Sequence, residues 1–102
     1  MQEHERREKQ RFPVQLPIVI TSPSTGSEIQ GVTRDVSGKG VFFYPKSWPS
    51  GLSSIVFKMI LPSEVTGTES TRVRCEGTVV RLELTAESST GVAATIDSYE
   101  FG

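Results

Sequence analysis

Apolar residues in this chain of 102 residues recur at every second position, in short segments separated by turn-forming residues. Alternation with this period over about four to eight residues is typical of a β-strand with one buried face. The segments predicted as strands are residues 12–21, 28–36, 41–44, 55–61, 73–84 and 92–96. Clusters of Ser, Thr, Pro and Gly between them predict turns and loops. We find no segment with the period of an amphipathic helix.

Two details of these segments favour a barrel over a flat sheet. Pro13 and Pro17 share one side of the first segment, and proline cannot donate to a central ladder, so this segment is expected at an edge or rim. In the fifth segment the apolar phase changes between Val79 and Val80, which predicts a bulge or sharp bend nearby. We therefore predict an all-β fold, in which residues 12–102 form a small six-stranded antiparallel β-barrel.

The charge distribution divides the chain into a short basic arm and a mildly acidic body. The formal net charge is −1, so a DNA or RNA polymer is not an expected partner. Residues 1–11 hold four basic and three acidic side chains and lack an apolar stripe. We predict that they form a flexible N-terminal arm. A local positive charge of this size suits a small anionic ligand better than a polymer.

The reactive side chains indicate no catalytic or metal site. The chain has one cysteine, Cys75, and one histidine, His4. Two such residues fall short of the four ligands of a structural zinc site, and no motif couples His4 to Cys75 or Ser37, so neither a metal, a cofactor nor an enzymatic activity is expected. Cys75 is in phase with Val73, which predicts a buried thiol. No apolar run approaches about 20 residues, so no membrane insertion is expected, and a reducing cytoplasm is the predicted location.

Two short motifs stand at the edges of this β pattern. The arm contains an RxxxR motif from Arg7 to Arg11, with Arg6 in front of it, and a DxSxxG motif follows over residues 35–40. Taken alone, the first is explained by a solvated charged tail and the second by an Asp-initiated turn. The first occurs by chance in about 20–25% of chains of this length and the second in about 5%. Both together, in this order, are expected in roughly one chain in a hundred or fewer.

RxxxR followed at this distance by [D/N]xSxxG resembles the signature of PilZ domains, which are bacterial receptors for cyclic di-GMP. The resemblance covers roughly residues 6–102 and implies a PilZ-like split barrel that changes conformation on binding the messenger and signals to a downstream protein, here unidentified. It further implies that Arg7 and Arg11 bind the phosphates and guanines of the ligand, and that Arg6 contributes to the binding of an intercalated ligand dimer.

The chemistry of cyclic di-GMP matches the residue types of both motifs. An arginine fork binds guanine O6 and N7, or a phosphate, with two hydrogen bonds, and its plane stacks on a purine. Asp35 is the expected acceptor from guanine N1–H and N2–H₂, and Ser37 adds a hydroxyl. Gly38 and Gly40 lack a Cβ, so the backbone can turn sharply and approach the ligand.

Several alternatives stay open at this level. Some members of the resembled family have lost the motif and act as adaptors between proteins without binding nucleotide, and this is the alternative function. Four aromatic residues follow the second motif and are expected to pack in the core or rim rather than stack on a ligand: Phe42, Phe43, Tyr44 and Trp48. Arg72, Arg74 and Arg81 fall on predicted strands, and Arg72 and Arg74 share a face that is expected to be solvated or ion-paired. Ligand stoichiometry, oligomeric state and downstream output are not predicted.

Overall fold

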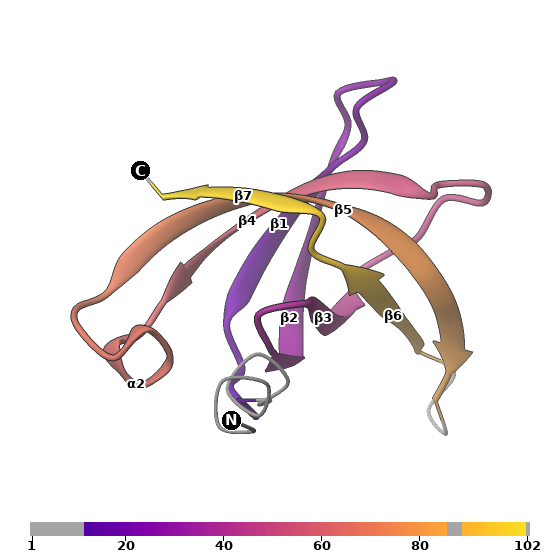
Figure 1. Ribbon diagram of the computed structural model, residues 1–102. Coiled ribbons are helices and arrows are strands. Elements are labelled where there is room, and N and C mark those ends of the chain that lie inside the picture. The colour runs from indigo at the N-terminus through magenta and orange to yellow at the C-terminus, as the bar shows by residue number, and fades with distance from the viewer. Residues whose placement is uncertain (1–11, 86–88, 102) are drawn as a thin grey trace, which may run out of the picture.

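The computed structural model describes residues 12–85 and 89–101, and these form mainly β-strands (Figure 1). The strands are β1 (Pro17–Thr21), β2 (Glu28–Val36), β3 (Gly40–Pro45), β4 (Ser54–Leu61), β5 (Thr71–Leu84), β6 (Thr90–Thr95) and β7 (Ser98–Phe101). A four-residue helix, α2 (Ser63–Thr66), lies between β4 and β5. The flexible arm predicted for residues 1–11 lies outside the described residues.

Six of the strands close into an antiparallel barrel. Neighbouring strands pair in the order β4-β1-β2-β3-β6-β5, and β5 pairs back with β4 along Thr71–Thr78. This confirms the predicted six-stranded barrel. The seventh strand, β7, was not predicted. It pairs with Val73–Glu76 on the edge of β5 that β4 does not occupy.

The core fills the inside of the barrel with the inward-facing residues of all six strands. Its most deeply buried side chains include those of Ile18, Ile20, Phe43, Phe57 and Val92. Cys75 is also buried there, as predicted, and burial raises the pKa of its thiol to about 11. Burying this apolar set is the main source of stability in a sheet of this size.

The bend predicted in β5 is present as a register shift against β6 between Val79 and Arg81. The apolar residues that follow it are nevertheless exposed, Leu84 by 79%. Their exposure follows from the topology, because β4 pairs with β5 only as far as Thr78. Beyond Thr78, β5 pairs with β6 on one edge and has no β4 neighbour on the other. Side chains in this part of β5 therefore stay exposed even where the alternation places them on the inner side of the sheet.

The first predicted strand is shorter than expected. β1 begins at Pro17, and Phe12 forms an isolated antiparallel bridge with Val36 instead of extending the strand. Pro13 and Pro17 are both exposed, in agreement with a position at the rim. Because Pro13 has no N–H to donate, a continuous ladder from Phe12 to Thr21 is not available to this segment.

Candidate functional site

The turn between β2 and β3 carries the DxSxxG motif and is held together by its serine. The buried Ser37 Oγ accepts hydrogen bonds from the N–H of Lys39 at 3.3 Å and of Gly40 at 3.2 Å. Its backbone N–H donates to the Gly40 carbonyl oxygen at 2.9 Å, and its Oγ donates to the same oxygen at 3.3 Å. A hydroxyl that satisfies neighbouring backbone groups in this way fixes the shape of the turn. Ser37 therefore has a structural role, and its contact with a ligand stays a prediction.

The glycine that ends the motif is required by a close contact with β6. A Cβ on Gly40 would lie 2.9 Å from the carbonyl oxygen of Ala94, closer than real Cβ atoms approach. Positive φ is not the reason, since among the described glycines it occurs at other positions. The turn is thus pressed against β6 at Gly40, while Gly38 is exposed at its tip.

The carboxylate of Asp35 is held on the outside of the barrel by the preceding arginine. The register of β2 against β3 shifts between Thr33 and Asp35. The side chain of Arg34, which lies between them in sequence, contacts the carboxylate of Asp35. Arg34 Nε donates to Asp35 Oδ2 at 2.9 Å, and its guanidinium lies 3.9 Å from the centre of the Phe42 ring. The hydrogen bond with Asp35 is the main cause that raises the pKa of Arg34. Asp35 itself is only 8% exposed.

A row of four outward-facing residues runs from this carboxylate across four strands. Asp35 pairs with Phe42, Phe42 with Ala93, and Ala93 with Arg81. We call the outer surface of β2, β3, β6 and residues 79–84 of β5 the site face. A hollow of about 200 Å³ opens on it, lined among others by Arg34, Phe42, Ala93 and Arg81.

Phe42 is buried, as predicted, yet it packs outside the core. It is 2% exposed and is absent from the core cluster inside the barrel. Its ring lies over Gly91, whose missing Cβ leaves the space, and meets the Tyr44 ring edge to face with centres 5.5 Å apart. With Arg34 on its face, this ring forms the apolar floor beside the Asp35 carboxylate.

The RxxxR motif lies outside the described residues, but the residue that follows it is placed. Phe12 N–H donates to the Val36 carbonyl oxygen at 2.7 Å, and Val36 N–H donates back to the Phe12 oxygen at 3.0 Å. Val36 stands between Asp35 and Ser37, and Arg11 directly precedes Phe12. The chain therefore leaves the last arginine of one motif and enters the barrel beside the other motif. The structure describes none of Arg6, Arg7 and Arg11.

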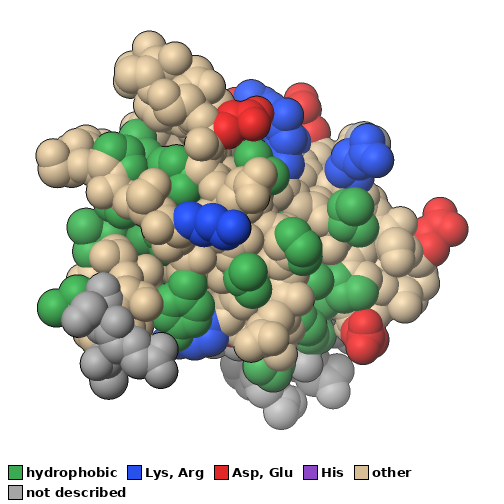
Figure 2. Space-filling view, turned by 180° about the vertical axis from the view of Figure 1, so that it is seen from behind, with side chains coloured by type: hydrophobic (Ala, Val, Ile, Leu, Met, Phe, Trp, Pro, Cys, Tyr) green, Lys and Arg blue, Asp and Glu red, His purple; other side chains and the backbone are tan. Residues whose placement is uncertain are grey.

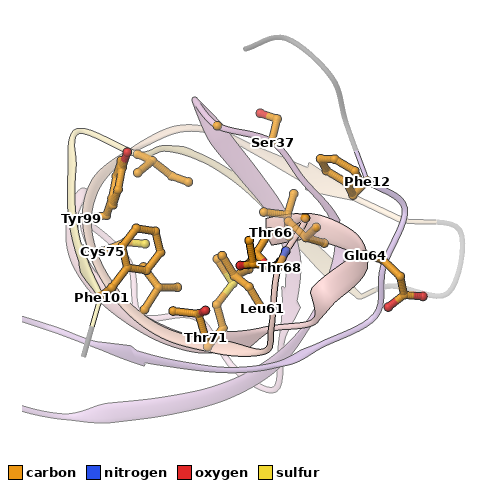
Figure 3. A pocket seen from close by; sticks show the side chains of 17 residues that line it. Phe12, Ser37, Leu61, Glu64, Thr66, Thr68, Thr71, Cys75, Tyr99 and Phe101 are labelled. Carbon is orange, nitrogen blue, oxygen red and sulfur yellow. The ribbon is translucent and has the colours of Figure 1, made fainter. Parts of the chain in front are cut away.

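A larger cavity of about 1080 Å³ opens at the same end of the barrel. Figure 3 looks into it: Phe12 lies on one side, Tyr99 and Phe101 lie on the opposite side, and Ser37 stands at the rim. The wall is largely apolar, and Tyr99 and Phe101 are both more than half exposed. This mouth and the hollow on the site face share Ser37, so the motif turn separates two openings.

The surface charges do not form one continuous field. Figure 2 shows basic and acidic side chains interspersed on one face of the molecule, with hydrophobic side chains scattered between them. Within residues 12–85 and 89–101 no group of three or more His, Cys, Asp or Glu side chains is arranged to hold a metal ion. No helix in these ranges is long and apolar enough to cross a membrane.

Fold and site together define a small antiparallel barrel whose motif-bearing turn faces the entry of its N-terminal segment. The chain belongs to the PilZ domain family, whose model matches residues 5–98 and thus includes both motifs. Comparison with curated proteins finds no sequence match.

The solved structures that share the fold include the following two. The Bacillus subtilis inhibitor of motility (MotI/DgrA) is 18% identical with a TM-score of 0.67, and the match covers 88% of this chain and 42% of that one. This chain thus spans less than half the length of that protein. The PilZ domain of CeSA from a cellulose-synthesizing bacterium is 22% identical with a TM-score of 0.57, and the match covers 87% of this chain and 83% of that one. At these identities the likeness concerns the fold alone.

Sequence reasoning did not identify Arg34 as part of the site. Its position depends on the bulge in β2, for which the sequence carries no signal comparable to the phase change in β5. The outward position of Phe42 was also missed, because a run of three aromatic residues hides the alternation of faces. The glycine that receives Phe42, Gly91, was read only as part of a turn.

Proposed function

We propose that this PilZ domain is a receptor for cyclic di-GMP that binds the messenger on the site face, between the N-terminal arm and the β2–β3 turn. The observation that carries the proposal is the paired backbone of Phe12 and Val36. It fixes the end of the arm within one residue of both Asp35 and Ser37. Arginines that begin one residue before Phe12 can therefore reach a ligand held at the turn.

The turn supplies the acceptor half of the site. Asp35 accepts from N1–H and N2–H₂ of one guanine, since a carboxylate is the group in the chain best suited to two adjacent donors. The ion pair with Arg34 holds this carboxylate in a fixed orientation before the ligand arrives. Pre-orientation of this kind reduces the entropy lost on binding.

The arm supplies the donor half. Arg7 and Arg11 bind phosphates and guanine O6 and N7 through their forks, and Arg6 contributes if a second ligand molecule stacks on the first. Ordering the backbone costs about 1–2 kcal/mol per residue, while each charge-assisted hydrogen bond returns about 1.5–3 kcal/mol. Several contacts must therefore form together, and binding is coupled to a change in arm conformation.

This change is the signal that we infer passes to a protein partner in the cytoplasm. The domain acts as a regulatory module and not as an enzyme. The mouth of the barrel adjoins the turn through Ser37, so a partner that contacts the mouth is close enough to sense the arm.

Titration calorimetry with cyclic di-GMP tests the proposal, with GTP and cyclic GMP as controls. We expect saturable binding of cyclic di-GMP, much weaker binding of both controls, and a stoichiometry that separates one bound molecule from a stacked pair. Absence of binding by folded protein would contradict the proposal. The remaining interpretation would then be an adaptor that binds another protein without nucleotide.

A further inference from the structure

The hollow on the site face extends well beyond the DxSxxG motif. Its lining includes Ser37 and Gly40 of the motif but not Asp35, and it also includes Arg81 of β5, a residue that belongs to neither motif. The paired row from Asp35 to Arg81 crosses three strand spacings of about 4.8 Å, so the two backbones are about 14 Å apart. A single guanine on Asp35 does not span this distance.

The lining of the hollow combines a small side chain, that of Ala93, with a positively charged one, that of Arg81. Ala93, which is next to Arg81 in the paired row, lines the hollow with a methyl group and is 8% exposed. Arg81 Nε donates to Glu83 Oε2 at 2.6 Å, and the side chain is 57% exposed. This hydrogen bond uses the inner nitrogen of the guanidinium, so it does not engage the edge formed by the two Nη groups. That edge is the one suited to two parallel hydrogen bonds with O6 and N7 of guanine.

We propose that this hollow is a second base subsite, in which the other guanine of a bound cyclic di-GMP lies over Ala93 and Arg81 binds its O6 and N7. The inference rests on the proposed function. It adds Arg81 as a ligand-binding residue and as the residue that selects guanine over adenine in the second half of the ligand. Adenine carries a donor at N6 where guanine has the O6 acceptor, so an arginine fork cannot bind it in the same way.

Arg74 provides a matched control on the same strand. It stands in an Arg–Glu pair with Glu76, two residues on, with Nη1 3.3 Å from Oε2. We call the outer surface of β1, β4, β7 and residues 71–78 of β5 the opposite face, and this pair lies on it. Arg81 and Arg74 thus share the strand, the charge and the kind of partner, and differ in the surface around them.

Calorimetric titrations with cyclic di-GMP and with the mixed cyclic dinucleotide of guanosine and adenosine test the subsite. We expect wild-type protein to prefer cyclic di-GMP at least 10-fold. Arg81→Gln is expected to weaken cyclic di-GMP binding about 10-fold and to reduce that preference, since glutamine binds adenine well. Arg74→Gln is expected to change neither affinity nor preference.

A second variant fills the hollow without removing charge. Ala93→Leu is expected to weaken cyclic di-GMP binding more than 10-fold, and the melting temperature without ligand checks that the barrel is intact. Ser98→Leu adds the same bulk on β7 and is expected to bind as wild type. If wild type binds cyclic di-GMP but Arg81→Gln and a folded Ala93→Leu keep both affinity and preference, the subsite is wrong while the proposed function stands. If wild type binds no cyclic di-GMP, the proposed function itself fails.

Discussion

The site face and the opposite face carry similar charges but differ in what lies between them. Each has arginines paired with carboxylates: Arg34 with Asp35 at 2.9 Å on the site face, and Arg74 with Glu76 at 3.3 Å on the opposite face. On the opposite face Arg74 pairs across the strands with Lys58 and Glu100, so long side chains stand next to one another.

On the site face the corresponding positions hold small residues. Gly40 and Ala93 line the hollow beside Arg34, Phe42 and Arg81, while the space over Gly91 is filled by the Phe42 ring. Because both faces carry arginines and only the site face has this hollow beside them, arginines alone do not define a ligand site on this barrel. What defines it is a cationic group beside a space kept open by residues without long side chains. The following predictions test this distinction, from the largest expected effect to the smallest.

Asp35→Asn is expected to have the largest effect on binding. It keeps the shape of the side chain but replaces a carboxylate that accepts two hydrogen bonds, each worth about 1.5–3 kcal/mol when charge-assisted. Cyclic di-GMP affinity measured by calorimetry should fall at least about 100-fold, equivalent to about 2.8 kcal/mol. Glu76→Gln makes the same kind of change on the opposite face and should leave affinity unchanged. Equal losses in the two variants would show that overall charge, and not the site face, governs binding.

Removing one arginine of the arm is expected to have the next largest effect. Arg7→Ala or Arg11→Ala should weaken binding about 10–100-fold, or about 1.4–2.8 kcal/mol, because several contacts must act together to order the arm. The melting temperature without ligand should hardly change. Lys9→Ala removes the same charge between the two arginines and is the control. Wild-type affinity in both arginine variants would remove the arm from the mechanism.

Variants in the two hairpin turns that flank β2 distinguish an effect on ligand binding from an effect on stability. Gly40→Ala brings a Cβ within 2.9 Å of the Ala94 oxygen, so we expect a loss of about 1–3 kcal/mol in urea unfolding together with weaker ligand binding. Gly26 has a φ of 78° with nothing within 4 Å of an added Cβ. Gly26→Ala should cost about 1–2 kcal/mol through backbone strain alone and leave affinity intact. Loss of affinity in the Gly26 variant would mean that binding follows global stability.

The smallest effect is expected at Asp97, in the corner between β6 and β7. Asp97 accepts hydrogen bonds from Thr78 Oγ1 at 2.7 Å and Thr95 Oγ1 at 2.8 Å, and these bonds lower the pKa of its carboxyl group. A carboxylate with a lower pKa in the folded state stabilises the fold above its unfolded value of about 3.9, and this contribution disappears as the pH falls through the folded value.

Thermal unfolding of Asp97→Asn should therefore show a slightly lower melting temperature than wild type at pH 7. The difference should shrink as the pH is lowered below about 4. Cyclic di-GMP affinity should be unchanged at pH 7. A difference in melting temperature that persists undiminished at the lowest pH would show that the hydrogen bonds from the two threonines do not depend on the charge of Asp97.

Much of the barrel follows from local patterns, and the failures have physical causes. The alternation over β2 predicted its bounds, and the phase change in β5 predicted the bulge at Val79, because each signal lies within one strand. The four-residue β7 was missed because Tyr99 and Phe101 are too few to establish a period. The exposure of Leu84 was missed because it depends on where β4 ends.

The candidate site was predictable only in part for the same reason. The motif residues Asp35, Ser37 and Gly40 are neighbours in sequence, so their turn could be recognised. Arg34 and Arg81 reach the site through a bulge in β2 and a pairing between β5 and β6, and no single segment records such long-range register. The predicted contacts of Arg6, Arg7 and Arg11 stay predictions, as do those of Asp35, Ser37, Gly38 and Gly40.

The central claim is that one molecule of messenger touches the arm and the turn together, and nuclear Overhauser effects from bound cyclic di-GMP test it most directly. With protein labelled at the arginine side chains and backbone amides, we expect the ligand protons to show contacts both to the guanidinium groups of Arg7 or Arg11 and to the amides of residues 37–40. Contacts confined to one of these two groups, or to the barrel mouth near Tyr99 and Phe101, would contradict it.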